Sequence, residues 1–94
     1  MQSSVQNLLQ GEMSSKELID SIFNDLESQI MDKREMSLNL EKVTFISVYF
    51  LERLENFVKK AKDLNVEVKI VNVLPSVYKV FQVGRSREIL ETIL

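Results

Sequence analysis

The segment LERLENFVKKAKDLNVEVKIVNVLPSVYKVFQVG, residues 51–84, decides the fold. Its first part repeats apolar residues every three or four positions, which predicts an amphipathic helix. We expect this helix to end near Asn65, because asparagine tolerates the left-handed conformation found at helix ends. Residues 66–73 are rich in β-branched side chains and predict a strand. Pro75 suits the first turn of a further helix, which we expect to stop at Gly84.

The residues that precede this segment predict further strands. Residues 36–40 alternate apolar and polar side chains, the period-2 signature of a strand. Residues 43–46 could extend that strand or follow it after a short kink. Residues 4–10 hold a weaker strand pattern, which we expect Gly11 to interrupt.

One more helix is predicted between the first two strands. Ser14 or Ser15 resembles a helix start, and apolar residues then recur at helical spacing through about Asp32. These apolar residues are Leu18, Ile19, Ile22, Phe23, Leu26 and Ile30. The tail, residues 88–94, predicts a short final helix or strand that packs back onto the domain.

Strands that alternate with helices favour crossover connections and an α/β fold. With 94 residues, 45% of them hydrophobic, the chain can bury one modest core, so we expect a single domain over residues 1–94. We predict a small mixed β-sheet of about four strands, with the helices packed mainly on one face.

The composition excludes several classes of function. The chain has no cysteine and no histidine, so it lacks thiolate nucleophiles, the commonest general base and the usual transition-metal ligands. We therefore expect neither an enzyme nor a cofactor or metal site. A net charge of -2 provides no basic field for nucleic acid. No apolar run is long enough to enter a membrane, and the N-terminus does not resemble a signal peptide, so a cytoplasmic location is expected.

The order and spacing of these patterns resemble the STAS domain family, the module of anti-sigma factor antagonists and of sulfate-transporter tails. The likeness covers roughly residues 5–94, and the joint spacing carries it rather than any single motif. The matching residues are Gly11, Leu38, Leu40, Val43, Phe45, Ile46, Leu51, Leu54, Val66, Val68, Ile70, Val73, Pro75, Val77, Val80, Phe81 and Gly84. The resemblance implies a non-enzymatic protein-interaction module that takes part in transcription regulation.

The loop before the second predicted helix departs from the family pattern. Members of the family carry Asp-Ser-Ser-Gly-Leu there, with a serine that a partner kinase phosphorylates. In this chain Ser47 stands at the aspartate position, Val48 at the first serine, Tyr49 at the phosphorylated serine and Phe50 at the glycine, while Leu51 is retained. Ser47 and Tyr49 are thus the hydroxyl-bearing equivalents of the phosphorylation loop. The usual phosphoserine switch is not expected.

Two interpretations of this loop remain open. In the first, Val48, Tyr49 and Phe50 form an exposed patch that docks a protein partner constitutively, because aromatic residues are favoured anchors at interfaces. We include Ser47, as an N-cap, and Arg53, on the outward face of the helix, among the expected partner-binding residues. In the second, Val48 and Phe50 turn inward and complete the core, leaving Tyr49 outside.

For partners, the resemblance implies an anti-sigma kinase-like protein, another STAS chain or a transporter subunit. The weak first strand also leaves an edge through which a homodimer could form. The alternative function is a STAS module, associated with a membrane transporter, that binds a small ligand such as a nucleotide, an anion or a lipid. We expect such a ligand in a groove at the carboxyl ends of the strands.

Overall fold

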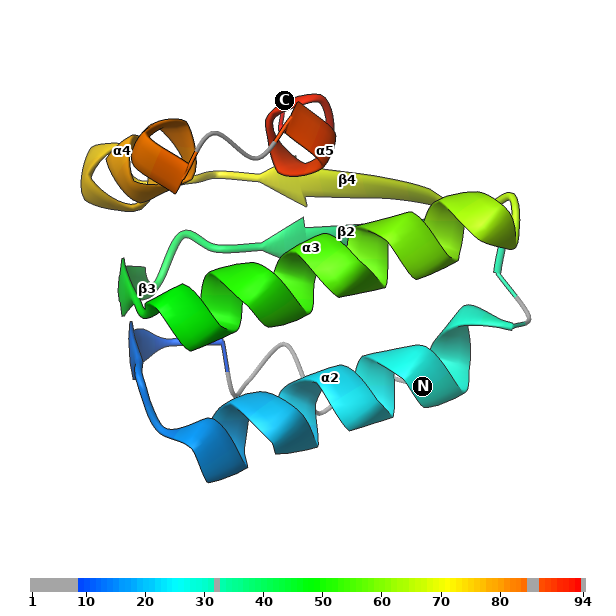
Figure 1. The fold of residues 1–94 in the computed structure, drawn as a ribbon, viewed down its shortest axis with the longest axis horizontal. Coiled ribbons are helices and arrows are strands. Elements are labelled where there is room, and N and C mark those ends of the chain that lie inside the picture. Colours follow the sequence, from blue (N-terminus) through cyan, green and yellow to red (C-terminus); the bar gives the residue numbers. More distant parts are fainter. Residues whose placement is uncertain (1–8, 32, 85–86, 94) are drawn as a thin grey trace.

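The computed structural model describes residues 9–31, 33–84 and 87–93 and shows an α/β chain of short strands and longer helices (Figure 1). In chain order the elements are β1 (Gly11–Met13), α2 (Lys16–Ile30), β2 (Glu35–Asn39), β3 (Val43–Ile46), α3 (Val48–Asp63), β4 (Glu67–Val71), α4 (Pro75–Gly84) and α5 (Arg87–Leu90). The predicted α/β fold class with four strands is confirmed.

The strands pair in parallel as two ladders, rather than as one sheet of mixed direction. β1 pairs with β3, and β2 pairs with β4 over the register Glu35↔Glu67 to Asn39↔Val71. A further parallel bridge joins Ile70 to Ile93, so the tail does pack back, as predicted. β3 follows β2 as a separate strand, which settles the alternative that the sequence left open.

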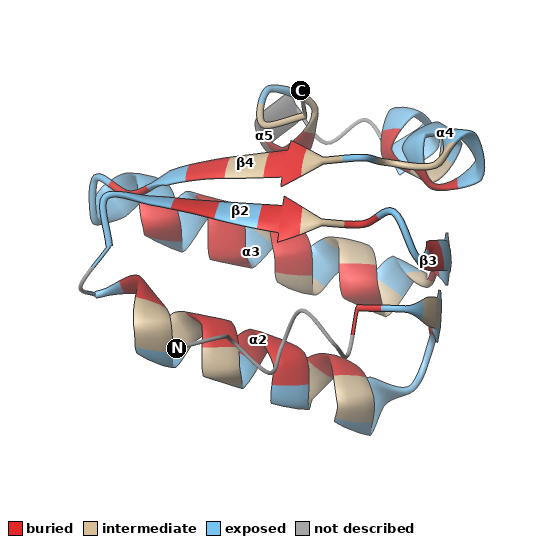
Figure 2. Cartoon of the chain, turned by 180° about the vertical axis from the view of Figure 1, so that it is seen from behind, coloured by how far each residue is buried: buried red, intermediate tan, exposed pale blue. Residues whose placement is uncertain are grey.

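Helix α3 lies on one face of the β2–β4 ladder, and α2 lies beside α3 on the side away from β4, as the two opposite views show (Figures 1 and 2). Met36 and Leu38 of β2 and Val68 and Ile70 of β4 are buried. The alternate positions of both strands are exposed or half-buried, and an ion pair of 3.5 Å joins Lys69 Nζ to a Glu35 carboxylate oxygen. Helix α3 therefore covers one face of this ladder, as the alternating sequence pattern predicts.

The core lies between the ladders and the apolar stripes of α2 and α3. Every residue of the stripe predicted for α2 is buried except Leu18, which is half-buried. Phe23 occupies the centre, with its ring centroid 5.4 Å from that of Phe50 and 5.9 Å from that of Phe57. These aromatic contacts join α2 to α3.

The helix ends follow the predicted capping chemistry. Ser15 caps α2, where its side chain accepts a hydrogen bond from Leu18 N, and Asn65 follows α3 with a φ of 60°. Gly84 is the last residue of α4, as predicted.

The first strand differs from the prediction. Residues 4–8 of the predicted strand lie outside the described residues, and Leu9 and Gln10 are not in a strand. Gly11 begins β1 instead of interrupting a strand, and its φ of 71° shows why glycine suits this position.

Candidate functional site

Ser47 forms the corner between β3 and α3 and is the N-cap residue of α3. Its backbone stays extended at φ −83° and ψ 168°, and its hydroxyl oxygen accepts a hydrogen bond from Phe50 N at 3.2 Å. Its own N–H donates to the carbonyl of Met13 in β1 at 3.0 Å. An extended N-cap lets the strand pass directly into a helix, so no glycine is needed where the resemblance expects one.

The three residues after Ser47 point in different directions, because successive helical side chains are about 100° apart. Val48 is 70% exposed, Tyr49 is half-buried, and Phe50 is 1% exposed beneath α2. The prediction that Phe50 belongs to a surface patch is wrong, because its ring packs edge-on against Phe23 in the core. The alternative is confirmed for Phe50, which turns inward and completes the core, and is wrong for Val48, which is exposed.

Tyr49 connects α3 to α2 through its hydroxyl, which donates a hydrogen bond to Asp20 Oδ1. This hydrogen bond and the nearby Lys16 hold the pKa of Asp20 below its ordinary value. The same bond, with partial desolvation, raises the pKa of Tyr49. Lys16 Nζ lies 3.4 Å from Asp20 Oδ2 and 5.3 Å from the centre of the Tyr49 ring. Tyr49 is therefore held in place at neutral pH.

Arg53, one turn after Tyr49, is also tied to α2. Its Nη2 donates to Asn24 Oδ1 at 3.3 Å, its Nε lies 3.7 Å from Asp20 Oδ1, and its guanidinium lies 5.5 Å from the centre of the Phe23 ring. Nε is buried and makes no hydrogen bond to any part of the chain that the structure describes. Arg53 thus covers the aromatic core and is only partly available to a partner.

The sequence interpretation missed Asp20 and Asn24. Their i, i+4 spacing places them on one side of α2, but such pairs are common on solvated helix faces. Only the packing of α2 against α3 shows that they face Tyr49 and Arg53.

The first turn of α3 also meets the last turn of α4. A Cβ at Gly84 would lie 2.5 Å from Leu51 Cδ2, so the two helices touch at this point. Val48 lies one turn before Leu51, and Val83, which is 76% exposed, directly precedes Gly84.

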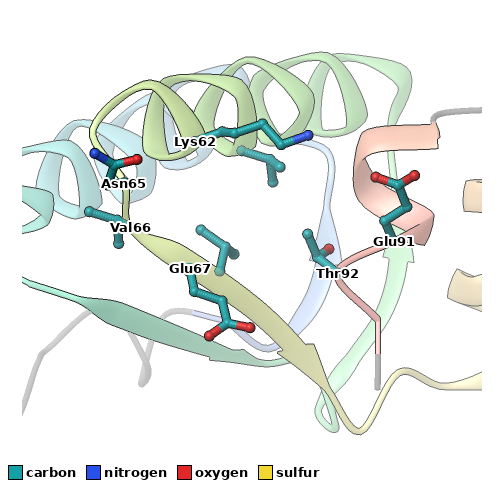
Figure 3. A pocket seen from close by; sticks show the side chains of 8 residues that line it. Lys62, Asn65, Val66, Glu67, Glu91 and Thr92 are labelled. Carbon is teal, nitrogen blue, oxygen red and sulfur yellow. The ribbon is translucent and has the colours of Figure 1, made fainter.

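A pocket of about 390 Å³ lies at the other end of α3, beside the amino end of β4 (Figure 3). A smaller one of about 130 Å³, lined by Leu9, Asn39, Glu41 and Lys42, lies at the carboxyl end of β2. Of these two, the larger is thus not at the strand ends where a ligand groove was predicted.

No group of three or more aspartate or glutamate side chains in the described ranges is placed to hold a metal ion. Within the same ranges, none of the helices combines the length and the apolar character needed to span a bilayer.

Comparison with protein families gives a match to the STAS domain over residues 9–93. The chain belongs to the STAS domain family. A comparison with curated proteins gave no match. Membership makes this STAS domain a module of the kind found in anti-sigma factor antagonists and in transporters, a family that is in general non-catalytic. The corner departs at the four positions Ser47 to Phe50 from the pattern that the sequence resemblance implies.

Proposed function

We propose that this STAS domain is a non-enzymatic interaction module that docks a protein partner on the first turn of α3. The observation that carries the proposal is Val48, an apolar side chain that is 70% exposed at the start of α3, one turn before the contact of Leu51 with the end of α4. Burying such a side chain against a partner is favourable, at about 25 cal/mol per Å² of apolar surface. Tyr49 and Arg53 form the rim of the contact surface.

The contacts with α2 support this role for Tyr49 and Arg53. Both side chains are ordered before a partner arrives, Tyr49 by Asp20 and Arg53 by Asn24. A contact surface that is already ordered loses less conformational entropy on binding. Phe50 takes no part in the contact and instead supports the turn from below.

We also propose that the corner is not a phosphoserine switch. The Ser47 hydroxyl is engaged as the cap of α3, and the Tyr49 hydroxyl is engaged by Asp20. A phosphate on Tyr49 would meet the Asp20 carboxylate, and the two cations that could compensate, Lys16 and Arg53, already lie within 4 Å of that carboxylate. The partner is then bound constitutively.

The partner belongs to one of three classes in this proposal: an anti-sigma kinase-like protein, another STAS chain or a transporter subunit. A location in the cytoplasm and a role in transcription control belong to the same proposal. Of the three classes, only a STAS chain identical to this one would give a homodimer, which light scattering over a concentration series would detect.

The test compares Val48→Asp with Met31→Asp. Met31 is a matched control because it is 72% exposed and follows the far end of α2 (Figure 1). The tagged variants are used to capture proteins from the native cells, and a captured protein of the three classes is then purified for affinity measurement. We expect Val48→Asp to weaken binding about 10-fold or more and Met31→Asp to leave it unchanged. Equal effects of the two substitutions would refute the assigned surface.

A second measurement tests the absence of a switch. Intact-mass spectrometry of the protein purified from its own cells should show the unmodified chain. Phosphate on Ser47 or Tyr49 in a substantial fraction of molecules would refute this part of the proposal while leaving the docking surface in place.

A further inference from the structure

The pocket beside the amino end of β4 has an apolar floor. It lies between the last turns of α3, the start of β4 and the residues that follow α5 (Figure 3). Val58, Val66 and Val68 line it and are each only 5% exposed. Its volume of about 390 Å³ is in the lower part of the range of small-molecule sites, about 300–1,000 Å³.

One wall of the pocket is fixed by its hydrogen bonds to β4. Ile70 N in β4 donates to the Thr92 carbonyl at 2.9 Å, and Ile93 forms a parallel bridge with Ile70. Thr92 Oγ1 donates to the Ile89 carbonyl at 2.6 Å. These bonds hold Thr92 and the adjoining Glu91 beside the valines, so the pocket exists without a ligand.

The rim of the pocket carries one positive and one negative side chain. Lys62 extends across the opening from α3, and Glu91 stands on the opposite side (Figure 3). The Glu67 carboxylate takes no part, because its side chain alternates with those of Val66 and Val68 and points to the other face of β4. Over the described ranges, neither Lys62 nor Glu91 has an ion-pair partner within 4 Å. The rim therefore has no net charge but offers both signs of charge to a ligand.

We propose that this pocket is a binding site for a small zwitterion, an amino acid with a compact apolar side chain. The valine floor takes the apolar side chain of the ligand, Lys62 meets its carboxylate and Glu91 meets its ammonium group. A ligand of one charge, such as a nucleotide, a fatty acid or an amine, gains only one of these contacts and brings its charge towards the rim side chain of the same sign. The site lies at the opposite end of α3 from Val48, so it can fail or succeed independently of the proposed docking surface.

The experiment uses three probes that share one apolar side chain and differ in charge. L-leucine carries both charges, L-leucinamide only the ammonium group and N-acetyl-L-leucine only the carboxylate. Each is titrated into the ¹⁵N-labelled chain at constant ionic strength and mildly acidic pH, where the free amino groups are protonated. The amide signals of Val66, Val68 and Thr92 are followed by NMR. We expect saturable shifts with leucine in the millimolar range, and binding several-fold weaker with the other two probes, because ion pairs of exposed side chains are individually weak.

Variants that remove one charge at a time decide whether the rim sets this order. Lys62→Met should bind leucine no better than leucinamide, because the contact with the ligand carboxylate is lost. Glu91→Gln should bind leucine no better than N-acetyl-leucine, because the contact with the ammonium group is lost. Lys59→Met, an exposed position on α3 that does not line the pocket, should keep the original order. The proposal is overturned if leucine gives no saturable shift at the pocket, if all three probes bind equally, or if the Lys62 and Glu91 variants keep the original order.

Discussion

The Tyr49 hydroxyl donates a hydrogen bond to the Asp20 carboxylate and so joins the first turn of α3 to α2, 29 residues earlier in the chain. This bond occupies the hydroxyl at the position where the sequence resemblance expects a modifiable serine. It also lies directly beside the buried pair Phe23 and Phe50, so the polar contact and the aromatic core hold the same two helices together.

Removing the Tyr49 hydroxyl should make the free energy of unfolding depend less on the ionisation of Asp20. The folded-state pKa of Asp20 is lowered chiefly by this hydrogen bond, so its stabilising effect is complete above the ordinary pKa of 3.8 and is lost as the pH falls through the folded value. Tyr49→Phe should therefore unfold at lower urea than the wild type at neutral pH, and the difference should vanish at a pH below the folded pKa. A difference that persists there would show that the hydroxyl acts through packing.

Truncating Phe50 should destabilise the domain strongly, whereas truncating Val48 should not. Phe50 is 1% exposed and in contact with Phe23, so Phe50→Ala should cost about 3–5 kcal/mol of unfolding free energy. Val48→Ala should remain within about 0.5 kcal/mol of the wild type, because Val48 is mostly exposed. Urea unfolding followed by circular dichroism measures both variants. Similar losses in the two variants would contradict the assigned orientations.

Ser47→Ala should cost about 1 kcal/mol, because Phe50 N loses its cap at the start of α3. Ser47→Asp should recover most of this loss, since a carboxylate can accept the same bond and is favoured at a helix N-terminus. Thermal unfolding at equal ionic strength tests both variants. If alanine leaves the stability unchanged, the Ser47 hydroxyl does not act as a cap, and the backbone bond to Met13, which both variants keep, is sufficient to fix the corner.

Asn65→Ala should destabilise by about 1 kcal/mol, because the residue has a φ of 60° and alanine pays the steric cost of the left-handed region. Asn65→Gly should be neutral or mildly stabilising, since glycine adopts this conformation without that cost. Chemical unfolding of both variants measures the effect. A tolerated alanine would mean that the end of α3 rearranges.

Local chemistry made the helices and most strands predictable. The stripe of α2, the caps Ser15 and Ser47 and the left-handed Asn65 each depend on a residue's own type and its near neighbours. The two-ladder arrangement was not predictable in this way, because pairing joins residues more than 30 positions apart.

The corner was predictable only in part, and the reason is geometric. Val48 and Phe50 are both apolar, and the sequence alone does not say which face of the first helical turn meets α2. A rotation of about 200° between them places one in the core and the other at the surface. The Asp20–Tyr49 bond and the pocket beside β4 depend in the same way on how separate elements pack.

The order of the paired strands in the sequence also limits how the protein can fold from fragments or during its synthesis. In the sequence, β2 lies between the paired strands β1 and β3, and β3 lies between the paired strands β2 and β4. A single break anywhere between Met13 and Glu67 therefore separates the partners of at least one ladder. A nascent chain on the ribosome can complete the second ladder only after Val71 has emerged, so neither half of the polypeptide should mature alone.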